Sequence, residues 1–152
     1  MYKLLLLALA LASSVTLATP IKQYANIVKV QSSLKTAALT LDYVDIYFIE
    51  EDARKVIALG DYKTADEFYD ANPSGIYIRN VNKKLRKLNT DQNTVFEVVC
   101  LNDEAKVRTV DLPTFVKAVR GTPPATCWPF GDTVELTLDG PRLLKVSQVY
   151  FP

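Results

Sequence analysis

The chain has 152 residues, of which 49% are hydrophobic and 23% are charged, with eight prolines and five glycines. This is the composition of one ordinary globular domain, and it excludes a disordered tail, a collagen-like chain and a coiled coil. Its formal net charge of +1 provides no general attraction to nucleic acid or anionic lipid. The sequence has no histidine, which excludes His-ligated zinc and the imidazole-dependent Ser and Cys nucleophiles.

The first 18 residues have the pattern of a secretory signal peptide. A short, singly charged start precedes nine unbroken Leu and Ala residues from Leu4 to Ala12, and a small, polar stretch ends at Ala18. A membrane-spanning helix needs roughly 20 apolar residues, so a retained anchor is the less favoured alternative. We expect cleavage after Ala18, a secreted or periplasmic location, and one mature domain, residues 19–152.

Cys100 and Cys127 are the only two cysteines of the chain. An oxidising compartment would let them pair, and closing a loop of about 28 residues would stabilise the domain by about 3.6 kcal/mol in the chain-entropy description. The sequence has no Cys-x-x-Cys motif and no histidine to activate a thiol. We therefore interpret the pair as a structural disulfide, in preference to a redox or nucleophilic site.

The first part of the domain predicts strands. Ile27 to Val30 is a short apolar run, and Ala38 to Ile49 is a longer strand. Its apolar side chains change phase, which predicts a bulge or a break near Tyr43. Val56 to Leu59 is interpreted as the next strand. The acidic stretch Asp61 to Asn72 lacks a sustained period and is expected to be a loop or one helical turn.

Turn-forming residues separate the next strands. Asn72-Pro73-Ser74-Gly75 predicts a turn, after which a strand restarts at Ile76 and Ile78 and continues through Lys84 to Leu88. Thr90 to Asn93 predicts a second polar turn.

Thr94 to Leu101 and Ala105 to Val110 are then expected to form a hairpin through the turn Asn102-Asp103-Glu104.

The last part predicts a helix and a second hairpin. From Asp111 to Gly121, apolar residues recur at helical spacing after a capping Asp, which favours a helix over an edge strand. Thr133 to Leu138 and Leu143 to Phe151 are expected to pair through Asp139-Gly140-Pro141.

Strands at intervals of about ten residues predict a mainly β domain. We expect an antiparallel immunoglobulin- or transthyretin-like sandwich of about seven to nine strands with at most one or two short helices. A parallel α/β fold is disfavoured because no crossover helix is apparent between strands.

Short aromatic and glycine motifs recur along the middle of the chain. They are Val44-Asp45-Ile46-Tyr47, Leu59-Gly60-Asp61-Tyr62, Phe68-Tyr69 and Gly75-Ile76-Tyr77-Ile78. From Asn26 to Leu101 this series resembles an exported bacterial β-sandwich family catalogued only as a domain of unknown function. The family's His-Ala-Ser-Pro stretch is replaced here by Val30-Gln31-Ser32-Ser33. The resemblance implies a transthyretin- or immunoglobulin-like fold at a cell surface or in the periplasm, and it implies no catalytic residue.

Two segments carry opposite charge. Residues 42–70 hold nine acidic and three basic residues, and residues 79–87 hold five basic residues and no acidic one. Complementary charge favours docking to a partner, whereas the alternative is two solvated edges that could face each other. The basic stripe, as we name it, consists of Arg79, Lys83, Lys84, Arg86 and Lys87.

Tyr47 and Tyr77 alternate with apolar neighbours and are expected on an outer strand face, where tyrosine forms contacts well. The alternative places them among the core aromatics. Four carboxylates could be considered for calcium, but no calcium-loop motif is present; they are Asp45, Glu50, Glu51 and Asp52. We therefore predict no metal and no cofactor.

These observations predict a non-enzymatic binding or surface-interaction module with no catalytic residue. It would dock a protein or a cell-surface component through a sheet face or edge, using Tyr47, Tyr77 and the basic stripe, and it would not bind nucleic acid. The alternatives are an extracellular small-molecule carrier with an internal apolar cavity and a small secreted hydrolase that uses two carboxylates.

Overall fold

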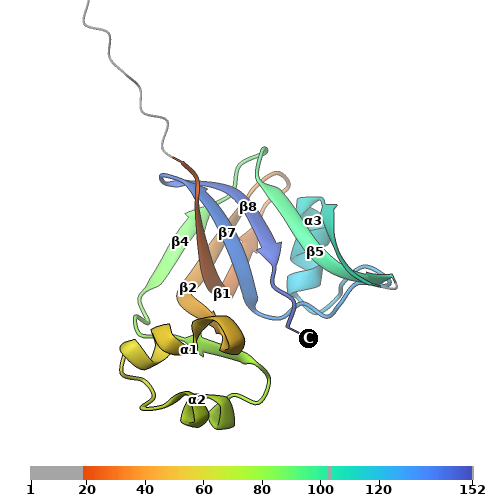
Figure 1. Ribbon diagram of the computed structural model, residues 1–152. Coiled ribbons are helices and arrows are strands. Elements are labelled where there is room, and N and C mark those ends of the chain that lie inside the picture. Colours follow the sequence, from red (N-terminus) through yellow and green to blue (C-terminus); the bar gives the residue numbers. More distant parts are fainter. Residues whose placement is uncertain (1–18, 103, 152) are drawn as a thin grey trace, which may run out of the picture.

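A computed structural model describes residues 19–102 and 104–151 (Figure 1). The expected signal peptide, residues 1–18, lies outside the described residues, as does Asp103 of the expected hairpin turn. In the described residues, eight strands form one sheet, which confirms the mainly β prediction, but three helices accompany them where at most two were expected.

The strands are β1 (Ile21–Ser32), β2 (Ala37–Phe48), β3 (Ile76–Arg79), β4 (Leu85–Asn89), β5 (Val95–Asn102), β6 (Glu104–Val110), β7 (Thr133–Asp139) and β8 (Arg142–Gln148). The helices are α1 (Ile49–Ala58), α2 (Ala65–Ala71) and α3 (Leu112–Val119). None of these helices is long and apolar enough to cross a membrane.

The sheet curls, and its strand pairings together with the chain connection from β4 to β5 form a ring. β1 pairs with β2 and with β7, β7 pairs with β8, and β8 pairs with β5. β4 pairs with β2 and is separated from β5 only by residues 90–94, so β4 and β5 act as one bent strand that completes the ring. β3 and β6 extend the sheet from β2 and β5.

Two features of this ring differ from the sequence-based expectation. The β5–β8 pair is parallel, whereas we expected antiparallel pairing throughout. The immunoglobulin- or transthyretin-like sandwich is not confirmed, because the eight strands belong to one sheet instead of two packed sheets.

The main core lies inside the ring and is closed by α3. Phe115 of α3 is fully buried, with its ring centroid 4.8 Å from that of Phe96 on β5. The helix predicted here is confirmed: the Asp111 side chain accepts a hydrogen bond from the Thr114 amide at 2.9 Å, and Gly121 ends the helix at a φ of 89°.

The phase change in β2 has a different cause from the expected bulge. β2 pairs with β1 without interruption from Val44 to Leu41, and the extra residue is Val28 of β1. Leu39 and Leu41 point into the main core, whereas Val44 and Ile46 are buried on the opposite face. The buried face therefore changes along a regular strand.

Helix α1 replaces the strand expected at Val56 to Leu59. Its N-cap residue, Phe48, has no side-chain oxygen, and instead the Asp52 carboxylate accepts a hydrogen bond from the Phe48 amide at 3.0 Å. Lys55 donates to the same carboxylate at 2.6 Å and, with the Phe48 amide, lowers the pKa of Asp52.

Helix α2 is longer than the single turn we expected. Thr64 accepts a hydrogen bond from the Glu67 amide at 3.2 Å, and the Glu67 carboxylate accepts one from the Lys63 amide at 2.9 Å. This pair of contacts is a variant of the capping box, because Glu67 accepts from the residue before the N-cap Thr64, and it starts the helix.

Cys100 and Cys127 form a disulfide, as predicted, with an S–S distance of 2.10 Å. It joins β5 to the segment that precedes β7. Hydrogen bonds of 2.8 Å from the Leu101 amide to the Thr126 carbonyl and from the Trp128 amide to the Val99 carbonyl flank it.

We predict that replacing both cysteines, Cys100→Ser with Cys127→Ser, lowers the free energy of unfolding by about 3.6 kcal/mol, because the unfolded chain regains the entropy of the open loop. Urea titration of both proteins measures this change. Adding a reductant should destabilise the parent protein and leave the double variant unchanged. Equal stability of the two oxidised proteins would contradict the prediction.

Candidate functional site

The structure divides the basic stripe into paired and free cations. Arg79 forms an ion pair with Asp61, and the Arg86 guanidinium lies 4.2 Å from the centre of the Tyr43 ring. Lys83, Lys84 and Lys87 are exposed. Within the part of the chain that the structure describes, these three lysines form no ion pair.

Tyr47 and Tyr77 are partly buried, and the expectation that they stand free on an outer face is wrong. They pair across β2 and β3 with ring centroids 6.2 Å apart. Both pack against a second, smaller core formed by α1 and α2, whose members are Ile49, Ala53, Val56 and Phe68. Burial raises the pKa of both phenols. Their use as contacts for a partner stays a prediction.

Asp61 links the loop between α1 and α2 to β3 at the edge of the sheet. It accepts hydrogen bonds from Arg79 and, at 3.2 Å, from the Tyr77 hydroxyl. The guanidinium lowers the pKa of the Asp61 carboxyl, with a smaller contribution from the phenol. Arg79 therefore serves the fold and contributes little free charge to the basic stripe.

Lys87 belongs to a row of side chains that crosses three strands on the outer face of the ring. Lys29 of β1 pairs with Thr40 of β2, and Thr40 pairs with Lys87 of β4. Directly paired residues share a face, and Thr40 alternates with the core residues of β2, so this face points outward. Lys29 and Lys87 are both exposed.

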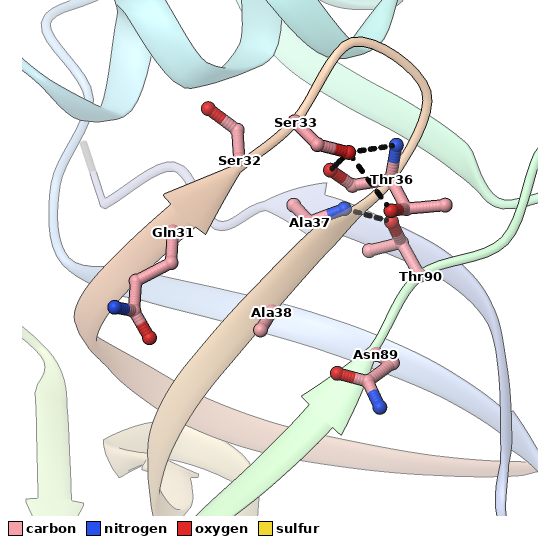
Figure 2. A pocket seen from close by; sticks show the side chains of 8 residues that line it. All are labelled: Gln31, Ser32, Ser33, Thr36, Ala37, Ala38, Asn89 and Thr90. Carbon is pink, nitrogen blue, oxygen red and sulfur yellow. Dashed lines mark hydrogen bonds between the residues drawn. The ribbon is translucent and has the colours of Figure 1, made fainter.

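The adjacent row carries amides in place of lysines. Gln31 of β1 pairs with Ala38 of β2, and Ala38 pairs with Asn89 of β4. The amide side chains of Gln31 and Asn89 stand on either side of the small Ala38 (Figure 2).

This amide row forms part of an open hollow of about 570 Å³ at the turn between β1 and β2 (Figure 2). The Ser33 and Thr36 hydroxyls form a hydrogen bond of 3.1 Å, which orders the turn. The Thr90 hydroxyl accepts a hydrogen bond from the Ala37 amide at 2.7 Å. The lining residues are Gln31, Ser32, Ser33, Thr36, Ala37, Ala38, Asn89 and Thr90. They are uncharged, and none of these eight is aromatic. The hollow thus offers hydroxyl and amide hydrogen-bonding groups beside two lysines.

On the side of the ring formed by β7, β8 and β5, two carboxylates are neutralised by lysines. Glu135 and Glu97 flank Ser147 across β7, β8 and β5. Lys22 pairs with Glu135 at 2.9 Å and Lys145 with Glu97 at 3.0 Å. Among residues 19–102 and 104–151, no cluster of three or more metal-ligating side chains is found.

Lys29, Gln31 and Asn89 were missed by sequence reasoning. The alternation of Lys29 and Gln31 with Val28 and Val30 was a usable signal for an outward polar face of β1. Their proximity to β4 depends on tertiary pairing that no local pattern reveals.

Comparison with known proteins found no matching family model, no matching curated protein and no matching solved structure. The chemistry of the hollow and its lysines therefore carries the functional argument.

We predict that Asp61→Asn lowers the free energy of unfolding near neutral pH and flattens its decline as the pH falls below about 5. The folded-state pKa of Asp61 is lowered, so its contribution is present above the ordinary carboxyl pKa and is lost as the pH falls through the folded value. Urea titrations across this range measure the change. The exposed Asp70, replaced by Asn, is the control, and an identical pH profile for Asp61→Asn and the parent would contradict the prediction.

Proposed function

We propose that the protein is a secreted or periplasmic, non-enzymatic binding module that holds a chain of acidic polysaccharide on the outer face of β1, β2 and β4. The observation that carries this proposal is the exposed pair Lys29 and Lys87 beside a hollow of uncharged hydrogen-bonding groups.

The lysine pair suits a ligand with repeated negative charge. Lys29 and Lys87 lie two strands apart, which places their backbones roughly 10 Å from each other. Both are free of ion pairs in the described part of the chain. A polymer with a carboxylate or sulfate on successive sugars can neutralise both at once.

The hollow suits hydroxyl groups better than bases. The amides of Gln31 and Asn89 each donate and accept hydrogen bonds, as sugar hydroxyls do. Binding of single-stranded nucleic acid usually relies on aromatic side chains that stack with bases, and the lining residues include none. The proposed partner is therefore a polysaccharide of a cell surface or matrix.

The order of the strands in the ring supports the location of the proposed binding site on β1, β2 and β4. The OB-fold, a five-stranded, partly open barrel, binds oligonucleotides or oligosaccharides on the face of its second and third strands and on neighbouring loops. Here β2 is the second strand of the ring, and the bent β4–β5 strand is the third. This analogy concerns the fold and supports the place of the site, and the ligand class follows from the side chains.

Other features favour this proposal over the alternatives. The disulfide is typical of an oxidising compartment. A carrier needs an empty interior, whereas Leu41, Phe96 and Leu136 fill the inside of the ring. A hydrolase of this kind needs two carboxylates in its cleft, whereas the eight residues that line the hollow beside Lys29 and Lys87 include no carboxylate.

We predict that Lys29→Ala with Lys87→Ala weakens binding of heparin oligosaccharides and of polygalacturonate about tenfold or more and reduces the salt dependence of binding. Gln31→Ala with Asn89→Ala should weaken binding without changing the salt dependence, because it removes uncharged contacts. Isothermal titration calorimetry at two salt concentrations measures both effects.

The matched control is Lys63→Ala with Lys106→Ala, which removes two exposed lysines outside the site. No binding of either polysaccharide by the parent protein, or an equal loss in the control, would overturn the proposal. Equal or tighter binding of a single-stranded oligonucleotide would replace polysaccharide with nucleic acid as the ligand.

A further inference from the structure

A second hollow, of about 450 Å³, lies between α1 and α2. Ala53 and Ile57 of α1 and Ala65 of α2 provide an apolar floor. Tyr69 lines one side with 42% of its surface exposed. The groove therefore presents apolar surface that this copy of the chain leaves uncovered.

The rim of this groove is acidic. Glu50 and Glu51 line it from the first turn of α1. Arg54 is the one cation in the lining. Neither glutamate forms an ion pair within the described part of the chain, so two carboxylates against one guanidinium leave the rim with net negative charge.

The segment Val81–Leu85, which leads into β4, has the complementary composition. Val81 is 67% exposed and Leu85 is 51% exposed. Between them lie the exposed Lys83 and Lys84, and the Lys84 amide donates to the Asn82 side chain at 3.1 Å, which orders the turn. The segment thus presents two cations between two exposed apolar side chains.

We infer that the protein forms a dimer in which the segment 81–85 of each copy docks in the α1–α2 groove of the other. The apolar side chains at the two ends of the segment would pack on the apolar floor of the groove. Lys83 and Lys84 are opposite in charge to Glu50 and Glu51. Opposite charge on the two surfaces sets the orientation of the contact. Each copy carries both surfaces, so two exchanged contacts close a two-fold dimer.

The polysaccharide site shares no residue with this contact, and the two adjoin on β4, where Leu85 lies two residues before Lys87 on the same face. Lys29, Gln31, Lys87 and Asn89 belong to neither the segment nor the groove. Dimerisation is therefore measured without polysaccharide, and its outcome is independent of the proposed ligand.

Sedimentation velocity over a range of protein concentrations at low salt tests the dimer. The parent protein should dimerise, and high salt should weaken the dimer. Lys83→Glu with Lys84→Glu should weaken it about tenfold or more, and Glu50→Lys with Glu51→Lys should do the same, because each variant sets like charges against each other.

An equimolar mixture of the two reversed variants should restore the dimer, because each segment then meets a groove of opposite charge. Lys106→Glu with Lys117→Glu is the control and should dimerise like the parent. Val81→Ser with Leu85→Ser changes exposed side chains only and should weaken the dimer without altering charge, which keeps the test valid if the Glu50 and Glu51 variant misfolds.

A parent protein that stays monomeric at millimolar concentration, reversed variants that dimerise normally, or a mixture that stays monomeric would each overturn the inference.

Discussion

The short crossing from β4 to β5 is the constraint on which the rest of the structure depends, and two threonine hydroxyls make it possible. Thr90 accepts a hydrogen bond from the Ala37 amide at 2.7 Å, and Thr94 donates one to the Leu143 carbonyl at 2.9 Å. Both threonines are buried. Polar backbone groups at a buried crossing need partners, and these hydroxyls supply them to β2 and β8. The crossing thereby joins the two sides of the ring.

The closed ring gives the proposed binding face its rigidity. Asn89 ends β4 directly before the crossing, so its position opposite Gln31 is set by the same contacts that close the ring. Sites on packed strands hold their geometry better than sites on loops. The α1–α2 groove has a different basis, because it rests on the smaller core and on the Arg79–Asp61 pair. The proposed binding face therefore rests on one core and the proposed docking surface on another.

Local sequence patterns predicted those elements whose ends are marked by turn-forming or capping residues. Turn residues predicted the hairpin of β7 and β8, and an N-cap residue predicted helix α3. The disulfide was predicted because the sequence has a single pair of cysteines. Helix α1 was missed because its start carries no capping side chain. The capping box at Thr64 and Glu67 was present in the sequence and could have revealed α2.

Long-range features had no such signal. The parallel pairing of β5 with β8 joins segments about 50 residues apart, and the single sheet follows from it. The burial of Tyr47 and Tyr77 depends on two helices that the sequence did not clearly predict. Lys87 was predicted as part of the basic stripe from the charge pattern. Lys29 lies on β1, which approaches β4 only because both strands pair with β2.

Mapping of backbone amide shifts in isotope-labelled protein during titration with polygalacturonate tests the central claim most directly. We predict shift changes centred on Lys29, Gln31, Ala38, Lys87 and Asn89, with α3 unaffected. Changes centred on α3 or on the row from Glu135 to Glu97, or no changes at all, would contradict the claim that the outer face of β1, β2 and β4 is the binding surface.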